Sequence, residues 1–100
     1  MEFSNLLFVD ECLLDSERVR FFQSAITKVV NKNSIVVDAG TGTGIMALLS
    51  AKTGAKKVYA IEKNREVAYF AERNIIANGF EKIIEVCRED VFKFRLPKGE

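Results

Sequence analysis

The sequence predicts an α/β fold: half of a doubly wound, three-layer domain, with about three parallel strands in the order 3-2-1 and a helix before them. Short apolar, β-branched runs alternate with helix-like segments, a glycine-rich turn follows the first run, and all connections are short. Short connections suit right-handed crossovers between parallel strands. We expect a single domain over 1–100, with an N-terminal helical segment at 1–32 and the α/β half at 33–100.

The first part of the chain is predicted to be helical. Residues 1–14 are too apolar for a free tail, so we expect them to pack over another surface. Asp15 or Ser16 can cap a helix that ends near Asn31. Apolar residues recur there at spacings of three and four, which is typical of an amphipathic helix: Val19, Phe22, Ile26 and Val29.

The middle of the chain contains two predicted strands with a buried helix between them. Residues 34–38 form a short β-branched run, typical of a strand covered on both faces. Residues 44–52 are apolar almost all round, which predicts a buried helix that stops at Gly54. Residues 57–62 then predict the second strand.

A third helix and strand complete the pattern. Asn64 can cap the helix, and Asn78 with Gly79 can end it, since both residue types tolerate left-handed backbone angles. Residues 82–87 predict the third strand. Four side chains of the helix are expected to face the core: Val67, Phe70, Ala71 and Ile75. Six aromatic residues are expected in the core or over the sheet: Phe21, Phe22, Tyr69, Phe70, Phe92 and Phe94.

Composition excludes several classes of function. The formal net charge is +1, with 29% charged residues, so no strong field for nucleic acid or a membrane is expected. Cys12 and Cys87 are isolated and histidine is absent, so neither a metal site nor a disulfide framework is indicated. No secretion signal or bilayer-spanning segment is evident, which predicts a cytoplasmic protein.

The most informative stretch is Val-Val-Asp-Ala-Gly-Thr-Gly-Thr-Gly at 36–44. Glycines at a strand-to-helix turn let the backbone approach a ligand closely, and the amides of the following helix favour an anionic group. The dinucleotide fingerprint G-x-G-x-x-G is not met, because the third glycine falls one residue early at Gly44. Asp38 suits a ligand that carries an ammonium group and suits a pyrophosphate poorly. An NAD-binding domain is therefore the less favoured alternative.

Two more carboxylates follow the later strands. Glu62 comes at the end of the second strand and can accept hydrogen bonds from both hydroxyls of a ribose. Asp90 follows the third strand and can accept one from the amino group of adenine. In this topology the carboxyl ends of neighbouring strands line one crevice, so the pattern predicts a nucleoside site.

Together these residues resemble the class I S-adenosylmethionine-dependent methyltransferases over roughly 34–91. The resemblance implies a Rossmann-like fold that binds S-adenosylmethionine and releases S-adenosylhomocysteine. The turn would cradle the methionine moiety and Glu62 the ribose, with Lys63 at its rim, while Asp90 and the amide of Val91 would hold the adenine. The implied cofactor-binding residues are Arg18, Asp38, Gly40, Thr41, Gly42, Gly44, Glu62, Lys63, Asp90 and Val91.

Within that class the sequence looks most like the protein arginine methyltransferase group, through the turn and through 51–58. The segment 15–18 with Phe22 resembles that group's preceding helix, whose arginine contacts the cofactor carboxylate, and this implies the role of Arg18. The group's histidine before that helix is absent, since Val9 stands near its place, and its paired-glutamate loop lies beyond residue 100. Arginine specificity is therefore not implied, no catalytic residue is assigned, and the methyl acceptor stays open.

The length of the chain leaves two hypotheses. A complete methyltransferase sheet has four further strands, so we interpret the sequence as a truncated domain, the N-terminal half. It is either the cofactor-binding part of an enzyme or a non-catalytic cofactor-binding or interaction module. The first strand would then have an open apolar edge, which predicts a homodimer through that edge or through the N-terminal segment.

Overall fold

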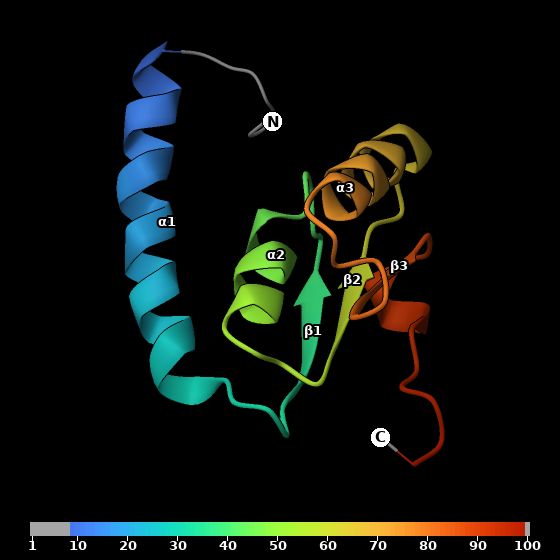
Figure 1. Cartoon of the computed structure of the whole chain (residues 1–100). Coiled ribbons are helices and arrows are strands. Elements are labelled where there is room, and N and C mark those ends of the chain that lie inside the picture. The colour runs from blue at the N-terminus through green and yellow to red at the C-terminus, as the bar shows by residue number, and fades with distance from the viewer. Residues whose placement is uncertain (1–8, 100) are drawn as a thin grey trace.

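The computed structural model describes residues 9–99 and has the predicted alternation of helices and strands (Figure 1). A long helix stands at one side, and the remaining elements alternate around a small sheet. The order along the chain is α1 (Val9–Val29), β1 (Ile35–Ala39), α2 (Ile45–Lys52), β2 (Lys57–Ile61), α3 (Arg65–Ala77), β3 (Ile84–Cys87) and a 3-10 turn, η1 (Val91–Lys93).

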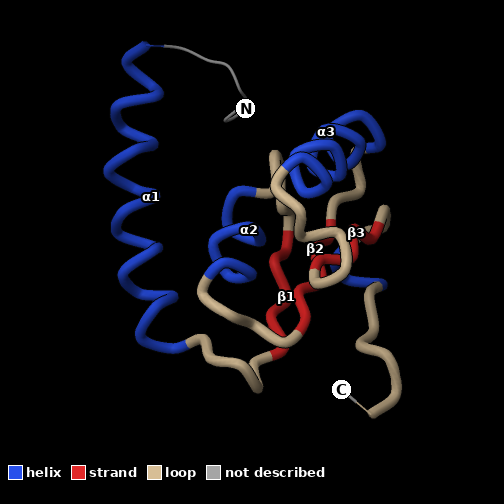
Figure 2. Tube along the Cα trace, viewed as in Figure 1, coloured by secondary structure: helices blue, strands red, loops and turns tan. Residues whose placement is uncertain are grey.

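The three strands form one parallel sheet in the order β1-β2-β3, which is the predicted order read from the other edge (Figure 2). The register aligns Val36 with Val58, and Val58 with Ile84. The middle strand β2 is the most completely buried, as expected for a strand with neighbours on both sides. The predicted α/β half-domain is therefore confirmed.

Helices α2 and α3 pack on the same face of the sheet. Alanines line the contact, so the helix backbones can approach the strands closely, and Ile75 of α3 fills the remaining space. One cluster of buried residues joins both helices to the sheet: Ala47, Ala51, Ala55, Val58, Ala60, Ile75 and Ile84. This packing fixes the starts of α2 and α3 at the carboxyl ends of the strands.

The opposite face of the sheet is covered by the C-terminal segment. The ring of Phe94 lies 5.6 Å from that of Tyr59, measured between centroids. Lys57 and Glu85 pair across β2 and β3 at 3.6 Å. Side chains in a strand alternate between faces, so Tyr59 points away from α2 while its neighbours Val58 and Ala60 point toward it.

Helix α1 begins at Val9, so the prediction that Asp15 or Ser16 caps it was wrong. No glycine or proline occurs between Val9 and Val29, and helix propagation adds residues at little cost once a turn exists. A polar residue that could cap a helix can also lie within one. The predicted packing of the opening residues concerns mostly 1–8, which lie outside the described residues.

The prediction for the aromatic side chains was wrong except at Phe94. The buried face of α3 is formed by Ala68, Ala71 and Ile75, so Phe70 points outward and is 62% exposed. Phe92 is 85% exposed. Phe21, Phe22 and Tyr69 are exposed as well. Phe70 follows Ala68 by two positions, about 200° around the helix, so it points away from the face that contacts the sheet.

The ends of α3 match the prediction in part. Asn64 is the N-cap, and its side-chain oxygen accepts a hydrogen bond of 3.0 Å from the amide of Val67. At the other end only Gly79 has a left-handed backbone, with φ of 80°, while Asn78 is right-handed. Asn78 instead closes the last turn through its amide, which contacts the carbonyl of Asn74.

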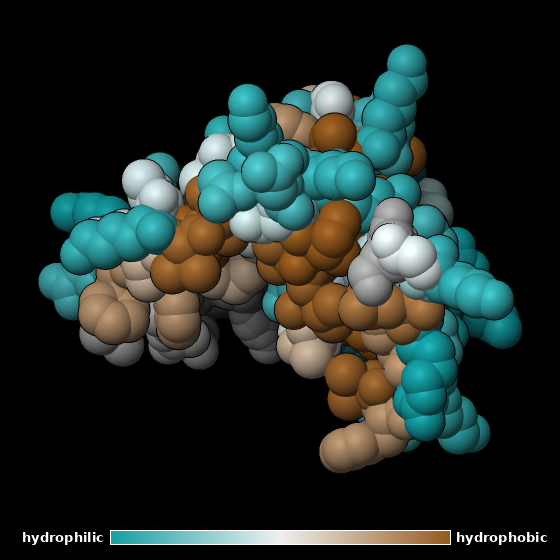
Figure 3. Space-filling view, turned by 90° about the horizontal axis from the view of Figure 1, so that it is seen from below, coloured by the Kyte–Doolittle hydropathy of each residue, from teal (hydrophilic) through white to brown (hydrophobic). Residues whose placement is uncertain are grey.

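Exposed hydrophobic side chains gather on the face seen from below in Figure 3, where brown residues are bordered by teal ones. Val29 at the end of α1 and Val37 on β1 are 75% and 43% exposed. Strand β1 pairs with β2 alone among the described strands.

In the described part of the chain no helix is long and apolar enough to cross a membrane.

Candidate functional site

The turn between β1 and α2 depends on glycine. Gly40, Gly42 and Gly44 have φ values of 67°, 58° and 90°, which residues with a Cβ atom rarely adopt. A Cβ on Gly40 or Gly42 would meet nothing within 4 Å, so the requirement there is conformational. At Gly44 a Cβ would also lie 3.5 Å from that of Ala71, so the turn passes close to α3.

Hydrogen bonds fix this turn against the end of β2. The amide of Thr41 donates to the carbonyl of Ile61 at 2.9 Å, and the amide of Gly42 donates to Oε1 of Glu62 at 3.2 Å. Gly44 begins α2 without a side-chain cap, and the first turn of this helix has no acidic residue. Its first amides therefore lack helical partners and are suited to an anionic group.

Asp38 is the most strongly perturbed acid of the site. Burial raises its pKa and the charge of Glu62 adds to this effect, whereas hydrogen bonds from the Thr41 hydroxyl and the Ala47 amide lower it. The Thr41 hydroxyl donates to Oδ2 of Asp38 at 2.6 Å. Among the described residues no lysine or arginine pairs with Asp38. The site thus holds a partly buried carboxylate that a cationic ligand would stabilise.

Glu62 follows β2 directly and is held in one orientation. Its own amide donates to the carbonyl of Cys87 at 2.9 Å, which ties it to the end of β3. Oε1 accepts from Gly42, and Oε2 accepts from the amide of Asn64, each at 3.2 Å. Each oxygen keeps a lone pair, so both can accept further hydrogen bonds from a diol.

Four more predicted residues lie in other parts of the structure: beside Glu62, after β3 and on α1. Asp90 follows β3, where its Oδ1 accepts a hydrogen bond of 3.0 Å from Phe92 and caps η1. Val91 starts this turn and is partly exposed. Lys63 is exposed beside Glu62. Arg18 belongs to α1, and its side chain lies outside the described part. Hydrogen bonds therefore join Asp38 with Thr41 and Gly42 with Glu62, and among the described side chains neither Lys63 nor Asp90 takes part in them.

One polar contact at the turn was not predicted. The side-chain amide of Asn74 on α3 donates to the carbonyl of Thr43 at 3.0 Å. A lone asparagine within a helical pattern gives no sequence signal of such a contact. The contact depends on the tertiary fold, which places α3 beside the turn.

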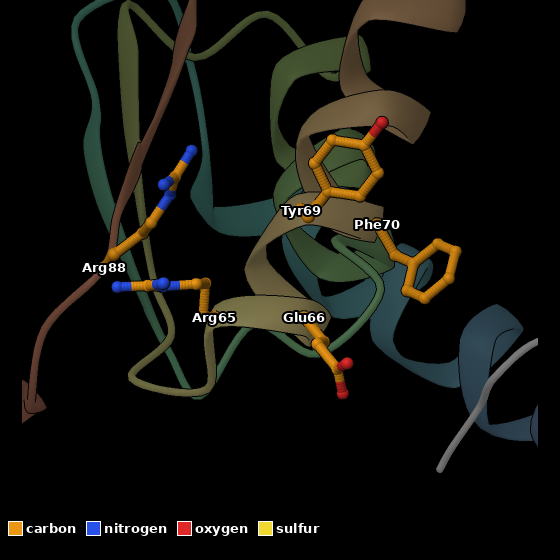
Figure 4. Close-up of a pocket in the computed structure, with 5 residues that line it drawn as sticks. All are labelled: Arg65, Glu66, Tyr69, Phe70 and Arg88. Carbon is orange, nitrogen blue, oxygen red and sulfur yellow. The ribbon is translucent and has the colours of Figure 1, made fainter.

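The sequence also did not predict a pocket of about 470 Å³ on the outer side of α3 (Figure 4). Its lining comes from the first turns of α3 and from the residue after β3: Arg65, Glu66, Tyr69, Phe70 and Arg88. Arg88 is already paired with Glu72 at 2.9 Å. The described residues contain no cluster of three acidic, cysteine or histidine side chains suited to a metal ion.

Comparisons with known proteins agree with this architecture. The family model described as ribosomal protein L11 methyltransferase (PrmA) matches residues 21–97. An uncharacterized protein of Methanocaldococcus jannaschii is 48% identical over 71 residues, 71% of this chain and 27% of its own. Protein arginine N-methyltransferase 1 of Oryza sativa subsp. indica is 40% identical over 90 residues, 88% of this chain and 23% of its own.

A solved structure shows the same relation. The Trypanosoma brucei PRMT1 enzyme-prozyme heterotetrameric complex with AdoHcy superimposes with a TM-score of 0.76 at 31% identity. The match covers 85% of this chain and 27% of that one. The chain spans about a quarter of the length of the relatives it matches.

The half-sheet, its turn and these matches define a class I S-adenosylmethionine-dependent methyltransferase fold that covers part of a domain. The chain belongs to the family described as ribosomal protein L11 methyltransferase (PrmA), and it is also similar to the protein arginine methyltransferases. Two groups with different acceptors can match one segment because function depends on sites added to a shared fold.

The buried carboxylate gives a testable effect on stability. Replacing Asp38 by Asn should raise the free energy of unfolding at neutral pH on the order of 1 kcal/mol, the usual scale of a single substitution. The raised pKa means that the folded state holds this proton more tightly than the unfolded state, so the wild type loses stability as pH rises through that pKa. Urea unfolding at several pH values measures the difference.

The gain should shrink as pH falls toward 3.8, the ordinary value for this acid. Glu81→Gln serves as the control, because it neutralises an exposed carboxylate outside the site. An Asp38→Asn variant less stable than wild type at neutral pH would contradict the account of Asp38.

Proposed function

We propose that this chain binds S-adenosylmethionine and is the cofactor-binding half of a methyltransferase. The observation that carries the proposal is Asp38, a partly buried carboxylate with a raised pKa, beside a left-handed glycine turn. S-adenosylmethionine has an ammonium group for such a carboxylate and a ribose diol for Glu62. Its own carboxylate suits the first amides of α2, apart from that of Ala47, which donates to Asp38. A dinucleotide would instead bring its pyrophosphate toward Asp38, and the two anions would repel each other.

The other predicted residues complete the proposed ligand contacts. Arg18 would pair with the ligand's carboxylate, because a guanidinium can form two parallel hydrogen bonds to it. Asp90 would accept from the adenine amino group with the oxygen that does not cap η1, and the Val91 amide would donate to the ring. Gly40 gives the ligand access to the backbone, and Lys63 lies at the rim of the ribose site.

Methyl transfer would proceed by in-line displacement. The acceptor's lone pair forms a bond to the methyl carbon while the carbon–sulfur bond breaks, and its electron pair returns to sulfur, leaving S-adenosylhomocysteine. A proton on the acceptor passes to solvent or to a base that we do not assign. The main contribution of these residues is to hold the reacting methyl group in position.

We further propose that the methyl acceptor is a protein. Support comes from the family description, which names a ribosomal protein, and from the similarity to protein arginine methyltransferases.

We also propose that residues 1–100 form one domain, in which 1–32 is the helical segment and 33–100 is the α/β part. We place it in the cytoplasm, where the unpaired thiol of Cys87 would stay reduced.

Calorimetric titration tests the cofactor proposal directly. We expect the purified chain to bind S-adenosylmethionine and S-adenosylhomocysteine, and Glu62→Ala to weaken both by about 10- to 100-fold, because bonds to a charged partner are the strong ones. Glu66→Ala is the matched control, since it removes an exposed carboxylate of the same type. Absence of binding by the wild type, or tighter binding of NADH, would contradict the proposal.

Transfer of a radiolabelled methyl group to a panel of proteins separates the two functional hypotheses. Labelled product would show the chain to be catalytic. Binding of the cofactor without any product would favour the non-catalytic module.

We also propose that two copies of the chain pair through the outer edge of β1. Next to this edge lies an apolar groove of about 300 Å³ between α1, β1 and α2. Val29 and Val37, which line it, are exposed and uncharged. Unpaired strand edges with apolar neighbours favour pairing with another chain.

Sedimentation equilibrium tests this pairing. The chain should be dimeric at micromolar concentration, and Val37→Lys should weaken the dimer about tenfold or more by placing a charge at the contact. Tyr69→Lys is the control, because it introduces the same charge at another exposed position on the far helix. A wild type that stays monomeric at high concentration would refute the pairing.

A further inference from the structure

Asn74 connects α3 to the glycine turn between β1 and α2. Its Nδ2 donates to the carbonyl of Thr43 at 3.0 Å, across 31 residues of sequence. Thr43 lies between Gly42 and Gly44, both in the left-handed region. Glycine has the widest range of backbone conformations, so a turn with alternate glycines needs external contacts to hold one of them.

The peptide bond between Thr43 and Gly44 is held on both sides. Its carbonyl accepts from Asn74, and its amide donates to the carbonyl of Thr41 at 2.9 Å. A peptide unit is planar, so fixing its carbonyl fixes the direction of its amide as well. Without the Asn74 bond, only the amide side would restrain the rotation of this unit.

A second contact brings the same two segments together. The position that a Cβ of Gly44 would occupy lies 3.5 Å from the Cβ of Ala71, which precedes Asn74 by one turn of α3. Ala71 is buried, so α3 presents a small residue and a hydrogen-bond donor side by side to the turn. Gly44 is also the residue from which α2 starts, so this contact sets where the free amides of α2 begin.

We propose that Asn74 is a positioning residue for the cofactor: it holds the Thr43–Gly44 peptide so that the turn and the first amides of α2 face the amino-acid part of the ligand. The inference rests on the proposed function, since it assigns Asn74 a role in that same site. It is specific in one respect. Asn74 bonds the turn at Thr43, next to the start of α2, whereas Glu62 bonds the turn at Gly42, so loss of the Asn74 bond should affect the amino-acid part of the ligand more than the nucleoside part.

An isosteric pair of variants tests this proposal. Asn74→Asp keeps the shape of the side chain but replaces the donor by an acceptor that faces the Thr43 carbonyl. Asn78→Asp is the matched control: it also removes an amide donor, here at the C-cap of α3, and the side-chain hydrogen bond of Asn78 goes to the helix carbonyl of Asn74 at 2.7 Å and not to the turn. Both variants are titrated with S-adenosylhomocysteine and with adenosine, and their unfolding is measured in urea.

We expect Asn74→Asp to weaken S-adenosylhomocysteine about three- to tenfold, the scale of one neutral hydrogen bond, and to weaken adenosine clearly less. Asn78→Asp should leave the affinity for both ligands unchanged whatever its stability. Equal losses for the two ligands in Asn74→Asp, or equal effects of the two variants, would overturn the proposal in favour of a purely structural role.

Amide hydrogen exchange gives a readout that needs no ligand. The Gly44 amide should exchange about three- to tenfold faster in Asn74→Asp than in wild type, because the peptide is then restrained on one side only. Its rate should stay unchanged in Asn78→Asp. If the wild type binds neither ligand, the proposed function fails while the exchange rate still decides whether Asn74 holds the turn. An unchanged Gly44 rate in Asn74→Asp would overturn the inference.

Discussion

The two hydrogen bonds accepted by the Glu62 carboxylate are the interaction on which the site depends. They join the glycine turn at Gly42 to the start of α3 at Asn64, while the Glu62 amide connects to the end of β3. Glu62 therefore contacts the segments that follow β1 and β2 and the end of β3. The parallel sheet makes this possible, because its strands all end on the same side, and the alanine-lined helices α2 and α3 keep that arrangement compact.

Asp38, unlike Glu62, lowers the stability of the folded chain at neutral pH while it prepares the site for a ligand. Its burial disfavours the charged form, and within the described residues only the Thr41 hydroxyl and the Ala47 amide offset that cost. Active sites are where such perturbed acids gather, since a ligand of opposite charge can restore the balance. Asp38, the glycine turn and Glu62 all lie in the first half of a methyltransferase domain. They determine the class of cofactor, and other residues determine the methyl acceptor. That division agrees with the similarity of this chain to two groups that have different acceptors.

The sequence predicted the strands, the glycine turn and the N-cap of α3 well, because each depends on residues close together in the chain. The short β-branched runs became β1, β2 and β3 within two residues of their predicted bounds. The start of α1 was not predictable from its caps, since several polar residues near it could serve as the cap. The outward position of Phe70 and the contact from Asn74 depend on which face of α3 meets the sheet, and tertiary packing decides this.

The most direct test of the central claim compares two ligands that differ only in the amino-acid part. S-adenosylhomocysteine and 5′-methylthioadenosine share the nucleoside and the thioether, but only the first has an ammonium group. At neutral pH the wild type should bind S-adenosylhomocysteine about 10- to 100-fold more tightly, and Asp38→Asn should lose most of that difference, since one charged contact is removed. Equal affinities for the two ligands, or a difference that Asp38→Asn leaves intact, would contradict a site in which the Asp38 carboxylate binds the ammonium group of the ligand.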